Sequence, residues 1–210
     1  MGLTFWGEVG PQTLSDGVSA PLRLGRSGEA MQSPLHSHFY ELAQRGNLFY
    51  GSTAASGVAP GTSVGTTAPF ALYNPAGSGK NLVVVKASLG YISGTLGAGT
   101  VFWCANNNVV AAPPSGTAIA AVPGKIDSQI APIGQPLTTA TLPASPKIVT
   151  PAFNLTALLA TTAVQPYTVQ DFPDGSLIVG PGSILSLQAV AAAGITPLVA
   201  FGIAWVEWPA

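Results

Sequence analysis

Two histidines and a glutamate lie close together near the N-terminus, at His36, His38 and Glu41. Imidazole and carboxylate groups are common metal ligands, so this cluster is the first candidate for a metal site. The surrounding residues predict a helix, on which positions 36 and 38 point about 200° apart. One ion cannot reach both imidazoles from that geometry. The histidines are therefore interpreted as surface or interface residues, and no metal is expected.

The segment Asn74–Asn81 (NPAGSGKN) is similar to a phosphate-binding loop because a glycine precedes Lys80. That motif requires a glycine five residues before the Gly-Lys pair and a serine or threonine after it. Asn74 and Asn81 occupy those two positions. The residues that follow, Leu82–Val85, predict a strand, whereas a phosphate loop opens a helix whose amides face the anion. The segment is interpreted as a turn between strands, and no cofactor is expected.

The remaining reactive side chains do not suggest a catalytic set. Asp171 and Asp174 flank a Phe-Pro pair, and Pro173-Asp174-Gly175 is a turn signature, so both carboxylates are expected to face solvent or an interface. Cys104 is the single cysteine and lies in a hydrophobic stretch that predicts a strand, which favours a small buried residue over a nucleophile. No segment resembles a nucleophile elbow. The chain is expected not to be an enzyme.

Charge is scarce along the whole chain. Seven basic and eight acidic residues make up 7% of the 210 residues, whereas about 25% is usual for a soluble domain. Between Gly46 and Gly124 the only ionised side chains are Lys80 and Lys86. Charge keeps a surface wetted and keeps copies apart, so a surface without it is expected to be covered by other chains. A net charge of −1 without a basic stripe argues against nucleic-acid binding.

A membrane partner is not expected either. The stretch Ser176–Val206 has no charge and is long enough to span a bilayer, but Gly180-Pro181-Gly182, Gln188 and Pro197 interrupt it. The first residues, Met1–Trp6, have neither a basic start nor an apolar core, so no secretory leader is expected.

The first 60 residues differ from the rest and predict an N-terminal arm with one helix and a flexible linker. Ser33 and Pro34 are typical of a helix start, and Gly46 is typical of a helix end, which predicts a helix near 34–45. A helix this short is marginal in water, so its apolar stripe must dock on a partner. The residues expected to make these contacts are Phe5, Trp6, Leu35, Phe39, Tyr40 and Leu42.

From residue 61 to 210 the pattern predicts a mainly β domain. Strands are expected near 69–73, 81–92, 100–105, 177–179, 184–190 and 198–208. The proline-rich stretch 111–146 favours edge strands and extended connections. In the last strand bulky residues such as Phe201 and Trp205 alternate with small ones such as Gly202 and Ala204, which predicts a core on one face and close approach of another layer on the other. The expected fold is an antiparallel β-sandwich, jelly-roll-like, preceded by an extended N-terminal arm and one short helix.

Several segments resemble small virion proteins of tailed bacteriophages. They are Phe70–Leu82 followed by Gly90–Gly99, and Gly180–Gln188 followed by a last strand that ends Trp205-Val206-Glu207-Trp208. The resemblance covers residues 68 to 208 and implies a jelly-roll sandwich that decorates or cements a capsid, often as a trimer. It implies as partners the major capsid protein and further copies of this chain. It also implies synthesis in the host bacterial cytoplasm and a final location on the capsid surface.

An alternative function is a receptor- or carbohydrate-binding sandwich of a phage tail or head fibre. Sugar sites combine exposed aromatic rings with amides or carboxylates, and the one such cluster in this sequence is Trp103 with Asn106, Asn107 and Asn108, which Tyr91 could join. The expected function is the structural one.

Overall fold

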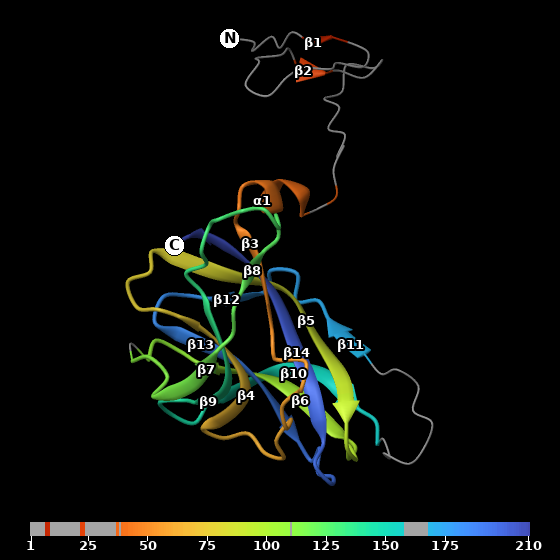
Figure 1. Ribbon diagram of the computed structural model, residues 1–210. Coiled ribbons are helices and arrows are strands. Elements are labelled where there is room, and N and C mark those ends of the chain that lie inside the picture. The colour runs from red at the N-terminus through yellow and green to blue at the C-terminus, as the bar shows by residue number, and fades with distance from the viewer. Residues whose placement is uncertain (1–6, 9–21, 24–36, 38, 110, 158–167) are drawn as a thin grey trace, which may run out of the picture. The chain divides into compact units, whose positions relative to one another are not determined.

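The computed structural model describes residues 7–8, 22–23, 37, 39–109, 111–157 and 168–210 (Figure 1). The chain divides into two compact units, Met1–Tyr40 and Glu41–Ala210. In the first unit, β1 (Gly7–Glu8) pairs in parallel with β2 (Leu22–Arg23). No helix among the described residues is both long enough and apolar enough to cross a membrane.

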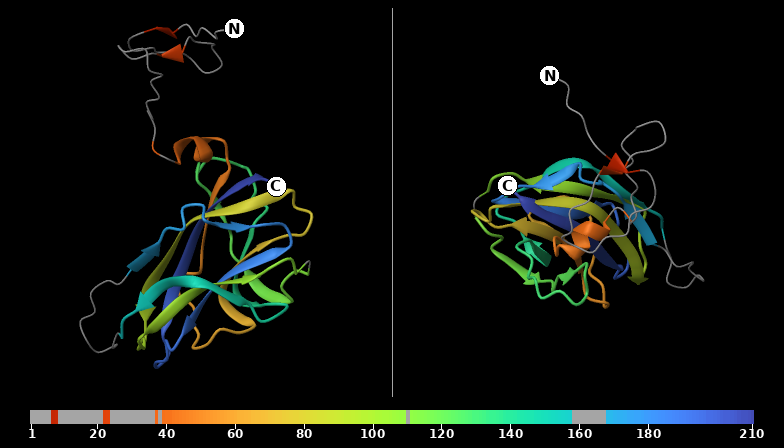
Figure 2. Two further views of the ribbon diagram at one scale, coloured as in Figure 1. Left: turned by 180° about the vertical axis from the view of Figure 1, so that it is seen from behind. Right: turned by 90° about the horizontal axis from the view of Figure 1, so that it is seen from above.

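The second unit is a sandwich of two antiparallel six-stranded sheets, seen from behind and from above in Figure 2. We name each sheet after a central strand. The β13 sheet has the order β10-β6-β13-β4-β9-β7 and the β14 sheet has the order β11-β5-β14-β3-β8, with β12 also paired to β5. The strands of the β13 sheet are β4 (Thr67–Asn74), β6 (Gly99–Asn106), β7 (Ser115–Ala118), β9 (Gln135–Thr141), β10 (Lys147–Leu155) and β13 (Ser183–Val190). Those of the β14 sheet are β3 (Leu48–Ser52), β5 (Lys80–Ser93), β8 (Val122–Pro123), β11 (Thr168–Asp171), β12 (Leu177–Val179) and β14 (Leu198–Pro209).

The core forms where the bulky faces of the two sheets meet. In β14 the side chains of Phe201 and Trp205 are fully buried, as the alternation in the sequence predicts. Phe201 packs against Phe70 of the other sheet, with 6.3 Å between ring centroids, and Trp205 stacks on Phe49 of β3 at 5.9 Å. Pairs of this kind add about 0.5–1.5 kcal/mol beyond the burial of their area. The predicted antiparallel β-sandwich is confirmed.

The helix α1 (Tyr40–Gln44) is the one helix among the described residues. It falls inside the predicted range of 34–45, and residues 34–36 and 38 lie outside the described residues. Gly46 ends the helix with a φ of +71°, a conformation that favours glycine. The amide of Gly46 donates to the carbonyl of Ala43, and the amide of Asn47 donates to that of Leu42. The predicted stop at Gly46 is confirmed.

The sequence predicts a loop or flexible linker over residues 51–67, and this segment is bound to the sandwich along much of its length. Gly51 and Ser52 belong to β3, whose amides and carbonyls pair with β14. We call residues 53–66 the strap. Its residues Thr53 and Val58 form backbone hydrogen bonds with β14, and Pro60 and Gly65 form hydrogen bonds with β13. The strap therefore connects the two sheets.

The proline-rich middle supplies one edge strand to each sheet, as predicted. These are β7 in the β13 sheet and β8 in the β14 sheet. The third strand, β9, contradicts the prediction because it pairs with β4 on one side and with β7 on the other. A proline inside β9, Pro136, lies opposite Leu72 in the register.

Candidate interaction surfaces

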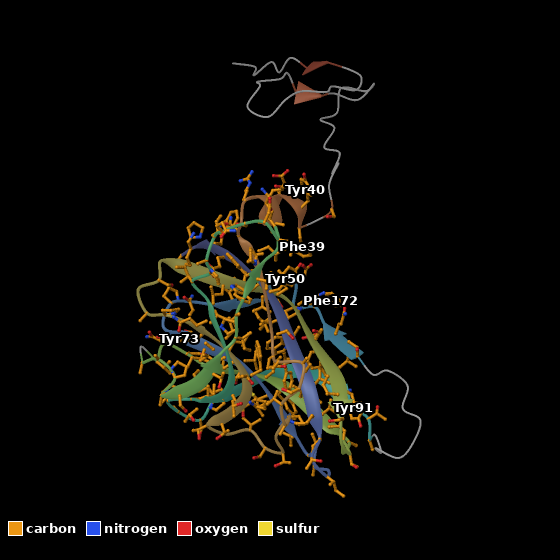
Figure 3. All side chains as sticks on the ribbon, in the orientation of Figure 1. Phe39, Tyr40, Tyr50, Tyr73, Tyr91 and Phe172 are labelled. Atoms are coloured by element: carbon orange, nitrogen blue, oxygen red, sulfur yellow. The ribbon has the colours of Figure 1, made fainter. Side chains whose placement is uncertain are left out.

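Three of the six predicted interface residues can be placed. Tyr40 is exposed, whereas Phe39 and Leu42 are half-buried. Figure 3 labels Phe39 and Tyr40 at the start of α1. The others, Phe5, Trp6 and Leu35, lie outside the described residues. That these six residues contact a neighbouring molecule stays a prediction.

The alternative sugar-binding cluster is not assembled as the sequence suggests. Trp103 is only 1% exposed and lies in the core, so it cannot serve as an open aromatic platform. Asn106 is also buried, and its Nδ2 donates to the carbonyl of Ala144 at 2.8 Å. Tyr91 lies in the other sheet, where its hydroxyl donates to the carbonyl of Gly94.

Asp171 bonds within the fold, which corrects the expectation that both carboxylates face outward. It is half-buried, and its Oδ2 accepts a hydrogen bond from Nε1 of Trp103 at 2.6 Å. Asp171 belongs to β11 and Trp103 to β6, so the bond joins the two sheets across the sandwich. Asp174 is exposed and has a positive φ of 45°, in agreement with the predicted turn.

Cys104 is fully buried, as predicted. Removal of the thiol from water raises its pKa to about 11, so the thiol is protonated at neutral pH. Among the residues that the structure describes, no three His, Cys, Asp or Glu side chains lie close enough together to hold a metal ion.

Exposed isoleucines gather on one loop, residues 124–134, which we call the isoleucine loop. Ile126 is 79% exposed, and Ile130 and Ile133 are exposed as well. The loop connects β8 of one sheet to β9 of the other beside α1 (Figure 1). Its two charged groups pair with each other, since Lys125 Nζ lies 3.8 Å from Asp127 Oδ1. The loop thus presents apolar side chains with little net charge.

A buried carboxylate holds the end of the isoleucine loop. Glu207 of β14 is 4% exposed, and its Oε1 accepts hydrogen bonds from the amides of Ile133 and Gly134, both at 2.8 Å. Nε1 of Trp205 donates to the same oxygen at 3.3 Å. Hydrogen bonds to a charged acceptor are stronger than neutral ones, so this contact fixes the backbone there. We call it the Glu207 latch.

Close packing fixes the loop at three further points. A Cβ atom on Gly134 would lie 2.9 Å from Leu82 Cδ1 and from Trp205 Nε1, so only glycine fits there. At the other end, the amide of Gly124 donates to the carbonyl of Leu48 at 2.7 Å. Ile130 lies directly against Gly46, where a Cβ would meet its Cδ1 at 2.3 Å. The isoleucines are therefore displayed from a constrained backbone.

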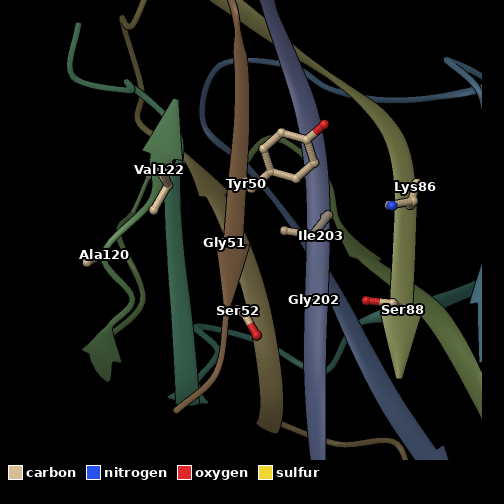
Figure 4. A pocket seen from close by; sticks show the side chains of 9 residues that line it. All are labelled: Tyr50, Gly51, Ser52, Lys86, Ser88, Ala120, Val122, Gly202 and Ile203. Atoms are coloured by element: carbon tan, nitrogen blue, oxygen red, sulfur yellow. The ribbon is translucent and has the colours of Figure 1, made fainter. Parts of the chain in front are cut away.

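A groove of about 320 Å³ lies on the outer face of the β14 sheet (Figure 4). Its floor is Gly202 of β14, which pairs with Ser52 of β3 on one side and Ser88 of β5 on the other. Two residues further along β14 and on the same face, Ala204 pairs in the same way with Tyr50 of β3 and Lys86 of β5. The remaining lining residues are Gly51, Ala120, Val122 and Ile203.

The sequence does not predict this groove, although it gives a partial signal of its floor. The small residues of the last strand do lie on the face opposite the core, as the alternation predicts. The walls come from β3 and β5, which the sequence does not place beside β14. Among the described residues Lys86 forms no ion pair, and it is the one charged residue that lines the groove.

A larger hollow, of about 650 Å³, lies between the strap, β4 and β9. It is lined by small, hydroxyl-bearing and apolar residues, among them Thr62, Thr138 and Leu198. None of the described residues that line it has an ionisable side chain. Nothing in this chemistry selects one class of ligand over another.

Comparison with protein-family models, with curated proteins and with solved structures finds no match for this chain. The geometry of these surfaces is therefore the basis for assigning a function. The isoleucine loop is an apolar surface held in a fixed shape. The groove is a small site that combines apolar walls with two serines and one lysine.

Proposed function

We propose that this chain is a non-enzymatic structural protein of a tailed-bacteriophage virion. It decorates or cements the capsid through contacts with the major capsid protein and assembles as a homo-oligomer, most simply a trimer. It is made in the host bacterial cytoplasm and is located on the capsid surface. The isoleucine loop carries the proposal, because it combines exposed apolar side chains with a backbone fixed by the Glu207 latch.

Fixed apolar surfaces are typical of binding sites for other proteins. Contiguous exposed apolar patches on soluble proteins mark interaction sites. A loop that already has its bound shape loses little conformational entropy when a partner docks on it, which favours affinity. Ile126, Ile130 and Ile133 are all exposed, and hydrogen bonds hold the loop at both ends, at Gly124 and at Ile133 and Gly134.

The scarcity of charge supports the same proposal. Ten of the 15 charged residues fall within the 170 residues of the second unit, Glu41–Ala210, so large parts of its surface carry none. A stable protein interface buries about 1,600 Å² and excludes charges from its centre. A sandwich with few charges can make several such contacts, as a capsid-bound oligomer requires.

The isoleucine loop gives the direct test of this proposal. We expect the double substitution Ile126→Glu and Ile130→Glu to weaken binding to particles that lack the protein by at least about tenfold, because charge would be buried in an apolar contact. Co-sedimentation of purified protein with such particles measures the effect.

Ile195→Glu provides the matched control. Ile195 is 76% exposed, nearly the same as Ile126, but lies in the connection between β13 and β14. We expect this variant to bind particles like the wild type. Unchanged binding by the double variant, with the wild-type protein bound to the particles, would show that the isoleucine loop is not the docking surface.

A further inference from the structure

Three polar side chains converge over the floor of the groove. Lys86 and Ser88 of β5 and Ser52 of β3 point toward β14 from opposite sides (Figure 4). Neighbouring strands lie about 4.8 Å apart, so the two serines face each other across about 10 Å of sheet. The groove can therefore contact a bound group from two sides at once.

The depth of the groove depends on a glycine. A Cβ atom on Gly202 would lie 2.7 Å from Ser88 Oγ, so any side chain there would fill the space between the strands. Ala204, the next residue on the same face, is small and buried. The ring of Tyr50 extends over β14 at this point (Figure 4). The groove is therefore open over Gly202, with the aromatic ring of Tyr50 beside it.

The polar groups define the charge of a complementary ligand. Within the described part of the chain Lys86 has no acidic partner, so its ammonium group is available to an anion. The single hydroxyl hydrogen of Ser52 is shared between the carbonyls of Thr53 and Phe201, each 3.3 Å from Oγ, which leaves the oxygen as an acceptor. One cation, hydroxyl donors and a hydroxyl acceptor match a ligand that has a carboxylate and its own hydroxyl groups.

The apolar walls define the remainder of the ligand. Tyr50 and Val122 are both exposed and pair with each other across β3 and β8. An aromatic ring and a branched aliphatic side chain suit a flat C–H surface. A volume of about 320 Å³ lies at the small end of the range for ligand sites, about 300–1,000 Å³.

We propose that this groove binds a sugar acid of the hexuronate class, as a residue of an acidic polysaccharide. The carboxylate lies against Lys86 and Ser88, a ring hydroxyl donates to Ser52, and the C–H face of the sugar ring packs on Tyr50. A neutral sugar would leave the ammonium group without a partner. The proposal is independent of the capsid function.

Titration of the full-length ¹⁵N-labelled protein with trigalacturonate tests the proposal. We expect saturable shifts of the amide signals of Ser52, Lys86 and Ser88, with a dissociation constant that rises with salt because one ion pair is involved. The neutral trisaccharide maltotriose should bind at least about tenfold more weakly. Lys86→Met should weaken trigalacturonate binding at least about tenfold, and Tyr50→Ala should weaken it by a smaller factor.

Lys147→Met is the matched control, because Lys147 is an exposed lysine on β10 of the other sheet. It should bind trigalacturonate like the wild type, and every variant should keep the wild-type melting temperature. Lys86→Met should also co-sediment normally with particles, which separates this site from the isoleucine loop.

Four outcomes would overturn the proposal. They are no saturable shift with trigalacturonate, equal affinity for maltotriose, equal loss of affinity in Lys147→Met, and a tetraglutamate peptide that binds as tightly as the sugar. The last result would assign the groove to an acidic protein segment.

Discussion

At the scale of single residues, Glu207 is a buried carboxylate that forms no ion pair within the described part of the chain. Three N–H donors surround its Oε1, from Ile133, Gly134 and Trp205. Burial of a charge is costly unless hydrogen bonds compensate for the lost water, and these three supply that compensation. The same bonds fix the end of the isoleucine loop, so Glu207 contributes both to the stability of the fold and to the surface proposed to bind the capsid.

We expect Glu207→Ala to lower the free energy of unfolding by about 1–3 kcal/mol, because two backbone amides lose their acceptor. Glu207→Gln keeps an oxygen at this position and should lose less. Urea denaturation measures the stability, and hydrogen exchange at the amides of Ile133 and Gly134 reports on the loop. If these amides in Glu207→Ala stay as protected as in the wild type, the Glu207 latch does not hold the loop.

Cys104 gives a second prediction at this scale. Its pKa of about 11 in the folded state lies above the ordinary value of 9.0 because burial disfavours the thiolate. We expect the native thiol to resist alkylation by iodoacetamide at pH 8 and to react readily in 6 M guanidinium chloride. Mass spectrometry after a timed reaction measures the difference. Equal rates in the two conditions would contradict the burial of this side chain.

The same pKa difference sets a direction for stability at high pH. The unfolded chain loses the thiol proton first as the pH passes about 9, so between about 9 and about 11 the folded state binds more protons than the unfolded state. The contribution of Cys104 to stability is complete below this window and declines as the pH rises through it. Comparison of the wild type with Cys104→Ala by urea denaturation at pH 8 and pH 10.5 isolates this contribution.

At the scale of elements, connections define the interaction surfaces as much as strands do. The strap forms hydrogen bonds with both β13 and β14. The isoleucine loop runs from β8 of one sheet to β9 of the other and packs against α1 and β3 on the way. The hydrogen bond between Trp103 and Asp171 joins β6 to β11 in the same way. Each of these contacts links segments that are distant in the sequence.

We expect Gly134→Ala to lower the free energy of unfolding by about 1–3 kcal/mol, because the added methyl group would overlap Leu82 and the Trp205 ring. Gly65→Ala is the control, since a Cβ at Gly65 meets no atom within 4 Å. Thermal denaturation of both variants measures the effect. Equal melting temperatures for Gly134→Ala and the wild type would contradict the close approach at this point.

At the scale of the whole molecule, the two units separate at Tyr40. The isoleucine loop, the groove and both sheets belong to Glu41–Ala210, and α1 contacts the loop through Ala43, which lies next to Gly124. A truncation that leaves the sandwich intact should therefore begin at Glu41, which keeps all of α1 except its first residue, Tyr40. Removal of residues up to 46 would also take away contacts made by Ala43 and Gly46.

We expect the 41–210 fragment to keep the melting temperature of the full chain within a few degrees but to bind particles more weakly. The truncation removes five of the six predicted contact residues, which are Phe5, Trp6, Leu35, Phe39 and Tyr40. Circular dichroism and co-sedimentation measure the two properties. Particle binding equal to that of the full chain would remove the arm from the proposed interface. Sedimentation equilibrium of the full chain tests the proposed trimer.

The sequence by itself determined the fold class and the faces of the strands. Successive side chains in a strand point to opposite faces, so the alternation along Leu198–Pro209 specified which residues enter the core. Local rules also specified the helix end at Gly46 and the burial of Cys104. Each of these features depends on residues within a few positions of one another.

Only the tertiary structure decided which strands lie side by side, and hence what the surfaces contain. Glu207 meets partners 73 and 74 residues earlier in the chain, and the groove takes its walls from β3 and β5 around β14. Trp103 is likewise buried by packing between the sheets, and its indole donates to Asp171 of the opposite sheet. Strand pairing depends on packing between segments that are far apart in the sequence. The side-chain periodicity of one strand therefore does not specify which strands lie beside it.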